Sequence, residues 1–206
     1  DKAEEDTQAA QLVNAASPIE MAREAARRNI PFLHISTDYV FDGSGTVPWR
    51  EGDRPSPQGV YGRTKLAGDM GVIGIVGPHA ILRTAWVFSP FGANFVKTML
   101  RVGPDRPSLN VVDDQFGGPT PAMEIAMALL VIARAFHAGR GVSGIYHFAG
   151  QPAVSWADFA EAIFDGHPSA PKIKRIPTSE YPTAARRPMN SVLNCAKIKA
   201  TYGTEQ

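Results

Sequence analysis

The chain has 206 residues, of which 21 are Lys or Arg and 20 are Asp or Glu, so its formal charge is +1. A charge this close to zero produces no overall field that would attract nucleic acid or an anionic membrane surface. Hydrophobic residues make up 44% and charged residues 20%, which is the balance of a globular domain that can bury a core. We therefore expect a folded domain with no nucleic-acid partner.

The number of cysteines and the length of the apolar runs indicate the cellular compartment of the protein. Cys195 is the single cysteine, so an internal disulfide is excluded. The longest apolar run, residues 125–133, is much shorter than the ~18 residues of a membrane-spanning helix. The charged residues 1–6 do not resemble the apolar segment of a signal peptide. These features predict a cytoplasmic protein with no membrane segment.

The first part of the chain alternates between helical and strand patterns. Ser-Pro-Ile-Glu at residues 17–20 predicts the capped start of a helix that ends near residue 28. The apolar run at 32–36 predicts a short strand buried on both faces. Residues 42–59 are rich in Gly, Pro and Ser, which indicates a long loop.

The alternation continues to the C-terminal region. Further strands are predicted at 80–85, 109–112 and 144–148. Further helices are predicted to begin at residue 60 and to cover 94–102. Two more helices are predicted, one from a Thr-Pro cap at 120–121 to residue 137 and one from a Ser155 capping box to residue 164. Strands that alternate with helices favour a mostly parallel sheet with helices on both faces. Such sheets bind ligands beyond the carboxyl ends of their strands, so the residues that follow each strand are the candidate site.

Polar and aromatic side chains follow two of these strands, at residues 37–39 and at Trp86. The helix from residue 60 opens with Tyr61 and Lys65, whose four-residue spacing places them on one helix face. A nearby cation favours a phenolate, so we expect Lys65 to lower the pKa of Tyr61 and to let it exchange a proton with a substrate oxygen. On this pattern alone, a solvated helix face and a plain strand end explain the residues equally well.

Longer motifs make the sequence similar to a known family. Residues 36–43 (STDYVFDG), 61–68 (YGRTKLAG), 83–88 (RTAWVF), 94–99 (NFVKTM), 114–120, 144–148 and 186–191 resemble, in order, the dTDP-4-dehydrorhamnose reductase family of extended short-chain dehydrogenase/reductases. The resemblance implies an α/β fold, a Rossmann-like doubly wound parallel sheet with a smaller C-terminal α/β substrate-binding part. Residues 1–112 would be the remainder of the NAD(P)-binding domain, and 113–206 mainly the substrate-binding part, interleaved with it.

The resemblance also implies a reaction. A hydride would pass from NADPH, or from NADH, to the C4 ketone of a dTDP-linked 4-keto-6-deoxy sugar, dTDP-4-dehydro-6-deoxy-L-mannose, to give dTDP-L-rhamnose. Tyr61 would donate the proton, Lys65 would lower its pKa and hold the nicotinamide ribose, and Thr37 would bind the oxygen that is reduced. Thr84 would contact the cofactor.

Further contacts to the nucleotide sugar are implied by the same resemblance, at Asp38, Tyr39, Trp86, Asn94, Arg186, Arg187 and Asn190. Tyr39 and Trp86 would contact the sugar, with aromatic packing at a strand end as the alternative. Forked guanidinium groups at 186–187 suit a diphosphate, and an exposed pair beside acidic neighbours is the alternative.

The five histidines have no metal-ligand spacing, so we expect no catalytic metal. Some members of the resembled family use acidic residues with Mg²⁺ at a dimer contact. Glu124 is the candidate here, although a solvated helix carboxylate is the favoured interpretation. A homodimer is the corresponding expectation.

The chain departs from the family in its dinucleotide-binding loop. Gly-x-x-Gly-x-x-Gly at 68–74 follows a predicted helix and precedes a strand, the reverse of the order that aims a helix N-terminus at pyrophosphate. We expect these glycines to fray the end of the preceding helix. Residues 1–6 resemble the middle of the family pattern, and 202–204 precede its last helix. An internal portion of this kind would bind NADPH weakly and be inactive by itself.

Two other functions stay open from the sequence. One is a non-catalytic NADP-binding regulatory subunit, because the β subunit of methionine adenosyltransferase resembles the same family. The other is a different nucleotide-sugar reductase or epimerase. Retained Thr37, Tyr61 and Lys65 favour an enzyme, and residues 37–39 and 186–187 favour the rhamnose branch.

Overall fold

The computed structural model describes residues 2–204. β1 (Phe32–Thr37), β2 (His79–Thr84) and β7 (Gly144–His147) form a parallel sheet in the order β1-β2-β7. Their carboxyl ends meet at one edge, because Thr37 pairs with Thr84 and Arg83 pairs with His147. These three strands and their parallel arrangement confirm the predicted fold class.

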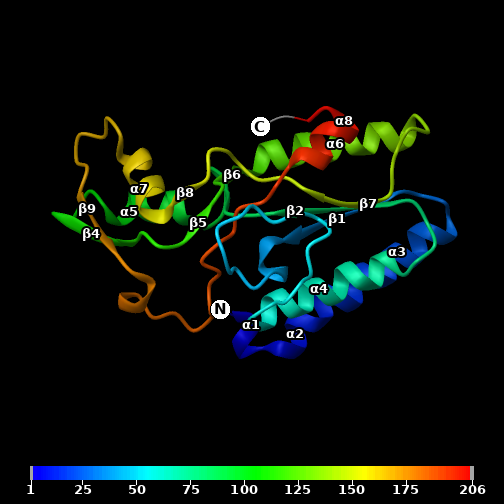
Figure 1. The fold of residues 1–206 in the computed structure, drawn as a ribbon, viewed down its shortest axis with the longest axis horizontal. Coiled ribbons are helices and arrows are strands. Elements are labelled where there is room, and N and C mark those ends of the chain that lie inside the picture. Colours follow the sequence, from blue (N-terminus) through cyan, green and yellow to red (C-terminus); the bar gives the residue numbers. More distant parts are fainter. Residues whose placement is uncertain (1, 205–206) are drawn as a thin grey trace.

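Helices cover both faces of this sheet (Figure 1). α3 (Ser17–Arg27) and α4 (Val60–Ile73) lie on one face, and α6 (Ala122–His137) and α8 (Ala196–Tyr202) lie on the other. The second face carries the largest apolar cluster, which joins Leu82 and Tyr146 of the sheet to Ile132 of α6 and Ile198 of α8. Each of these side chains is completely buried, so packing against both faces holds the sheet.

The N-terminal helices differ from the prediction at Ser17. α1 (Lys2–Glu5) and α2 (Thr7–Gln11) precede a π-helical turn, η1 (Leu12–Ala16), which runs directly into α3. Ser17 therefore lies inside a continuous helix, where its hydroxyl donates to the carbonyl of Leu12 at 2.8 Å, and it is not an N-cap. Pro18 has no N–H for the carbonyl of Asn14, and this missing bond accompanies the wide π turn.

α4 also differs from the prediction, because the glycines at 68 and 71 do not fray its end. The helix continues through both to Ile73. A Cβ at Gly68 would lie 2.2 Å from the carbonyl oxygen of Asn14, and a Cβ at Gly71 would lie 2.3 Å from the side chain of Ile19. The glycines let α4 pack closely against η1 and α3, which offsets their low helix propensity.

A second group of elements lies beside this sheet (Figure 1). Its strands are β3 (Val87–Phe88) with β6 (Thr120–Pro121), β4 (Ser108–Val112) with β9 (Lys172–Ile176), and β5 (Phe116–Gly117) with β8 (Val154–Ser155). Its helices are α5 (Phe95–Val102), α7 (Trp156–Phe164) and η3 (Thr178–Glu180), whereas η2 (Asp38–Val40) follows β1 of the main sheet and packs against α4. β4 precedes the expected division at residue 112 and pairs with β9, whereas β7 follows it and joins the main sheet. The division at 112 stays a prediction.

The predicted caps have different outcomes. Ser155 and Asp158 form the expected capping box of α7. Thr120 does not cap α6, because its hydroxyl is buried and donates to the carbonyl of Ala85 at 2.7 Å. Thr120 instead ties β6 to the segment after β2. Within residues 2–204, no helix is long and apolar enough to cross a membrane.

Candidate active site

A cavity of about 540 Å³ opens where β1 and β2 end. Its lining includes Ser36, Thr37, Asp38, Tyr39, Tyr61, Thr84, Trp86, Trp156 and Arg187. The parallel sheet brings the first of these together, because the residues that follow β1 and β2 emerge at the same edge. Seven of the predicted site residues therefore line one cavity.

Thr37 organises the turn that follows β1. Its hydroxyl accepts a hydrogen bond from the N–H of Tyr39 at 3.2 Å and lies 3.1 Å from a carboxylate oxygen of Asp38. Asp38 is 3% exposed. Burial raises the pKa of Asp38 to about 6, although hydrogen bonds from Ser191 and Thr37 work in the opposite direction. The polar end of β1 thus holds a carboxyl group that keeps its proton to a higher pH than an exposed aspartate does.

Tyr61 lies in the first turn of α4, and a residue from another helix caps the start of this helix. Gly59 offers no side-chain cap, and the carboxylate of Glu4 accepts the N–H of Val60 at 2.6 Å instead. The Tyr61 ring meets the Tyr39 ring edge to face, with centroids 5.6 Å apart. Contact from α1 thereby fixes the start of the helix that carries Tyr61.

The pKa of Tyr61 differs from the prediction. It is raised, chiefly because burial penalises the phenolate, and a hydrogen bond with Thr37 only partly offsets this. The carboxylates of Asp38 and Asp69 raise the pKa further. Lys65 was predicted to lower this pKa, whereas the net shift is upward. Tyr61 is therefore held as a phenol.

Lys65 lies one helical turn after Tyr61, and its ammonium is directed to β1. Nζ donates to the carbonyl of Ile35 at 2.6 Å and lies 3.4 Å from Nε2 of His34. Burial lowers the pKa of Lys65, whereas the carboxylate of Asp69 raises it. The ammonium of Lys65 is thus anchored on β1, and its effect on Tyr61 stays a prediction.

Thr84 and Trp86 follow β2. The Thr84 hydroxyl is buried and has no hydrogen-bond partner among the described residues. Buried hydroxyls without a partner are uncommon in proteins, so this group is suited to form a hydrogen bond with a bound ligand. Trp86 has a left-handed φ of 48°, and its ring stacks on Trp156 with centroids 3.5 Å apart. Both aromatic side chains line the cavity, so its wall is built before a ligand arrives.

A neighbouring cavity of about 370 Å³ shares Trp156 and Arg187 with the first. It is lined by Phe95, Thr98, Met99, Asn110, Val111, Val112, Gln115, Tyr181 and Thr183 as well. Trp156 donates its indole N–H to the side-chain oxygen of Gln115 at 3.2 Å. No sequence signal marked Trp156, Gln115 or Tyr181 as site residues, because the pairing of β5 with β8 and of β4 with β9 brings these segments to the site.

Three predicted substrate contacts line neither of these cavities. Asn94 caps α5, where its side chain accepts the N–H of Lys97 at 3.1 Å. Asn190 is buried, and its amide nitrogen donates to the carbonyl of Val47 at 2.9 Å. Arg186 lies 3.5 Å from the side chain of Gln58. Their substrate roles stay predictions, and the structure gives the two asparagines structural hydrogen bonds.

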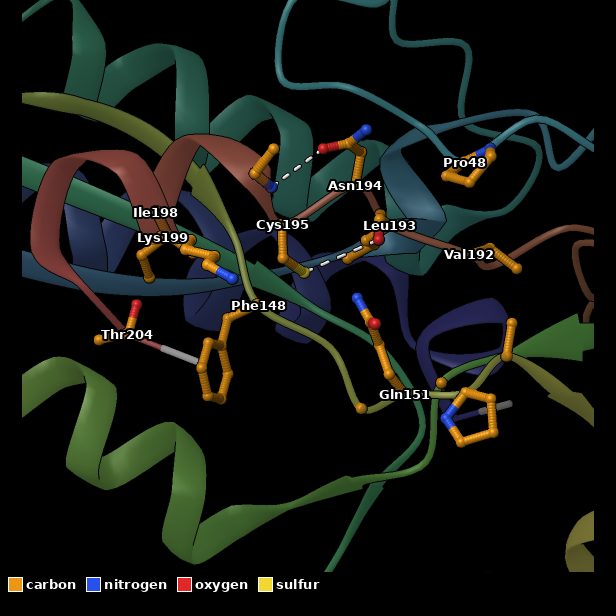
Figure 2. Close-up of a pocket in the computed structure, with 15 residues that line it drawn as sticks. Pro48, Phe148, Gln151, Val192, Leu193, Asn194, Cys195, Ile198, Lys199 and Thr204 are labelled. Carbon is orange, nitrogen blue, oxygen red and sulfur yellow. Dashed lines mark hydrogen bonds between the residues drawn. The ribbon is translucent and has the colours of Figure 1, made fainter. Parts of the chain in front are cut away.

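A separate cavity of about 570 Å³ lies between the end of β7 and α8 (Figure 2). Phe148, Gln151, Cys195, Lys199 and Thr204 are among its lining residues, and none of the predicted site residues is. Because no predicted site residue lines it, this cavity is not a candidate for the reaction site.

No group of three or more His, Cys, Asp or Glu side chains within residues 2–204 is arranged to hold a metal ion. Glu124 is exposed in the first turn of α6.

The sheet is parallel with helices on both faces, Thr37 and Tyr61 line the cavity at the carboxyl ends of its strands, and Lys65 donates to β1. These features define the class as a Rossmann-type short-chain dehydrogenase/reductase. A family model for the RmlD substrate binding domain matches residues 1–206. The dTDP-4-dehydrorhamnose reductase of Sinorhizobium fredii is 44% identical over 209 residues, which cover 98% of this chain and 71% of that protein. This chain belongs to the dTDP-4-dehydrorhamnose reductase family.

Solved structures agree. A dTDP-4-dehydrorhamnose reductase ortholog from Clostridium acetobutylicum superposes with a TM-score of 0.90 at 37% identity, over 98% of this chain and 70% of that one. The dTDP-4-dehydrorhamnose reductase of Bacillus anthracis, solved in complex with NADP, gives a TM-score of 0.89 at 31% identity, over 97% of this chain and 69% of that one. The fold and the family expected from the motifs are confirmed.

Proposed function

We propose that this chain reduces the C4 ketone of dTDP-4-dehydro-6-deoxy-L-mannose to dTDP-L-rhamnose with NADPH. The observation that carries this proposal is the cavity at the end of β1, which Thr37 and Tyr61 line together in a member of this family. Two hydroxyl groups at one point suit a carbonyl oxygen that gains negative charge and then a proton.

Tyr61 is suited to give that proton. Its raised pKa keeps the phenol protonated at neutral pH, which is the state that a proton donor needs. Thr37 is fixed by the N–H of Tyr39, so its hydroxyl is oriented before the substrate binds. We assign proton donation to Tyr61 and positioning of the sugar oxygen to Thr37.

The nicotinamide end of NADPH fits this edge of the sheet. The orphaned hydroxyl of Thr84 and the ammonium of Lys65 are the groups that would hold it, together with Tyr61. The cofactor supplies a hydride when it is bound. The Gly-x-x-Gly-x-x-Gly pattern at 68–74 does not lead from a strand into a helix, because Gly68 and Gly71 lie inside α4. We assign no residue to the pyrophosphate.

The two adjoining cavities fit the two parts of the substrate. The sugar would occupy the cavity beside Asp38, Tyr39 and Trp86, and the nucleotide would occupy the cavity lined by Phe95 and Met99, against Trp156. Arg187 lines both cavities, so its guanidinium is placed for the diphosphate between them. Arg186, Asn94 and Asn190 would contribute only after a local rearrangement.

Homodimer formation, with Mg²⁺ at Glu124, is a further part of the proposal. α6 exposes an apolar stripe of Met123, Met127 and Leu130 next to that carboxylate, and exposed apolar patches favour protein contacts. Light scattering with and without Mg²⁺ tests this part. A monomer at micromolar concentration in both conditions contradicts it.

The reaction is tested by isotope transfer. The longest natural chain that contains this sequence is incubated with NADPH deuterated at C4 of the nicotinamide and with the dTDP-4-keto sugar. The proposal predicts a dTDP-L-rhamnose product heavier by one mass unit. NADP binding without any turnover favours the regulatory subunit, and faster turnover of a different nucleotide sugar favours the other reductases or epimerases.

A further inference from the structure

A row of buried polar side chains lies beneath the catalytic cavity. Arg83 of β2 is 1% exposed, and its Nε donates to the carboxylate of Asp69 on α4 at 3.1 Å. Asp69 is fully buried. Neither residue lines the cavity. A buried ion pair gains little stability after desolvation, so a role in stability alone explains it poorly.

His34 connects this ion pair to Lys65. Its Nε2 lies 3.8 Å from the second carboxylate oxygen of Asp69 and 3.4 Å from Nζ of Lys65. Burial, and then the Lys65 charge, lower the pKa of His34 to about 4, so the imidazole is neutral at pH 7. A neutral ring nitrogen can accept a hydrogen bond from an ammonium.

We propose that His34 and Asp69 are positioning residues for Lys65: His34 accepts a hydrogen bond from the ammonium, and Asp69, fixed by Arg83, stabilises its charge. The role of Lys65 in the reaction rests on the proposed function, whereas these contacts do not. The carbonyl of Ile35 supplies the other anchor at 2.6 Å.

The physical need for such anchors follows from the lysine side chain. Its stem has four rotatable carbon segments and much rotamer entropy, so a single contact does not fix the ammonium in one place. The ionisable groups that act on the ammonium are His34 from β1 and Asp69 from its own helix, and Arg83 from β2 lies behind Asp69. Asp69 is the carboxylate that opposes the effect of burial on Lys65.

The test measures Lys65 itself. Wild type, His34→Leu and His34→Gln are treated with acetic anhydride over a range of pH, and acylation of Lys65 is quantified by peptide mass spectrometry. Loss of the acceptor destabilises the ammonium, so the midpoint of His34→Leu should fall by about 0.5 to 1 pH unit. His34→Gln keeps an acceptor and should stay within about 0.3 unit of wild type. Lys97 of α5 is the internal control.

An unchanged midpoint in a folded His34→Leu protein overturns the proposal. If His34→Leu does not fold, His34→Asn takes its place, because the shorter amide cannot span the distance to Lys65. Asp69→Asn is a weaker test by itself, since it also leaves Arg83 buried without its partner.

A double-mutant cycle carries the test to catalysis. His34→Leu should lower kcat/KM about tenfold in the wild-type background and have no further effect in Lys65→Met. Equal effects in both backgrounds show that His34 acts independently of Lys65 and overturn the proposal. Absence of turnover in the wild type contradicts the proposed reaction only, because the acylation midpoint needs no substrate.

Discussion

The wall of the sugar cavity can be tested at Gly117. A Cβ at this position would lie 2.5 Å from Cε2 and 2.6 Å from Nε1 of Trp86, and the other face of Trp86 is stacked on Trp156. The indole therefore has no room to move away. Gly117→Ala should lose about 1–3 kcal/mol from overpacking and recover about 0.4–1 kcal/mol from the stiffer unfolded chain.

The net loss for Gly117→Ala of about 1–2 kcal/mol corresponds to a fall in Tm of roughly 2–8 °C for a chain of this length. Thermal unfolding measures it, and near-UV circular dichroism reports the Trp86–Trp156 stack. Gly52→Ala is the matched control, because nothing lies within 4 Å of its Cβ, and it should be neutral or slightly stabilising. A Gly117→Ala protein as stable as Gly52→Ala, with an unchanged near-UV spectrum, refutes the reasoning.

Two further predictions concern buried polar groups. The pKa of Asp38 is raised to about 6 by burial, so the folded state holds its proton longer than the unfolded state, and Asp38 reduces stability as pH rises from about 4 to 6. Asp38→Asn should therefore match wild type in urea unfolding at pH 4 and exceed it by about 1–3 kcal/mol at pH 7; equal stability at both pH values contradicts this. The comparison between the two proteins removes the opposite contributions of His34 and His147, whose pKa values are lowered. Thr120→Val should lower the free energy of unfolding by about 1–3 kcal/mol, because the Thr120 hydroxyl donates to the carbonyl of Ala85 and accepts the N–H of Gly150 in the core. The control, Thr201→Val on the surface of α8, should change the free energy of unfolding by less than about 0.5 kcal/mol. Equal losses in the two variants contradict the role of Thr120.

The sequence predicted the fold well where the signal is local. Strands at 32–36, 80–85 and 144–148 lie where their apolar runs placed them, because a strand buried on both faces needs a short continuous apolar segment. The capping pattern at Ser17 was wrong because the residues before it are helical too. The packing of α4 on η1, which explains Gly68, is a contact between distant segments that periodicity does not report.

The site was predictable to the extent that it follows the strand ends. Thr37, Thr84 and Trp86 meet in one cavity because they follow adjacent parallel strands. Gln115 and Trp156 are brought to the site by the pairing of β5 with β8, which was not predicted. The pKa of Tyr61 could not be derived from its spacing to Lys65, since its upward shift comes chiefly from burial, which the spacing does not report.

The central claim is that the Tyr61 hydroxyl donates the proton to the reduced sugar. The most direct measurement compares Tyr61→Phe with Tyr202→Phe, whose hydroxyl contacts Val142 at the far end of the main sheet, for both turnover and NADPH affinity. Tyr61→Phe should lower kcat by at least about 100-fold, as expected for a lost proton donor, and leave the Kd for NADPH within about threefold, whereas Tyr202→Phe should retain the wild-type rate. A Tyr61→Phe enzyme that turns over as fast as Tyr202→Phe would contradict the claim.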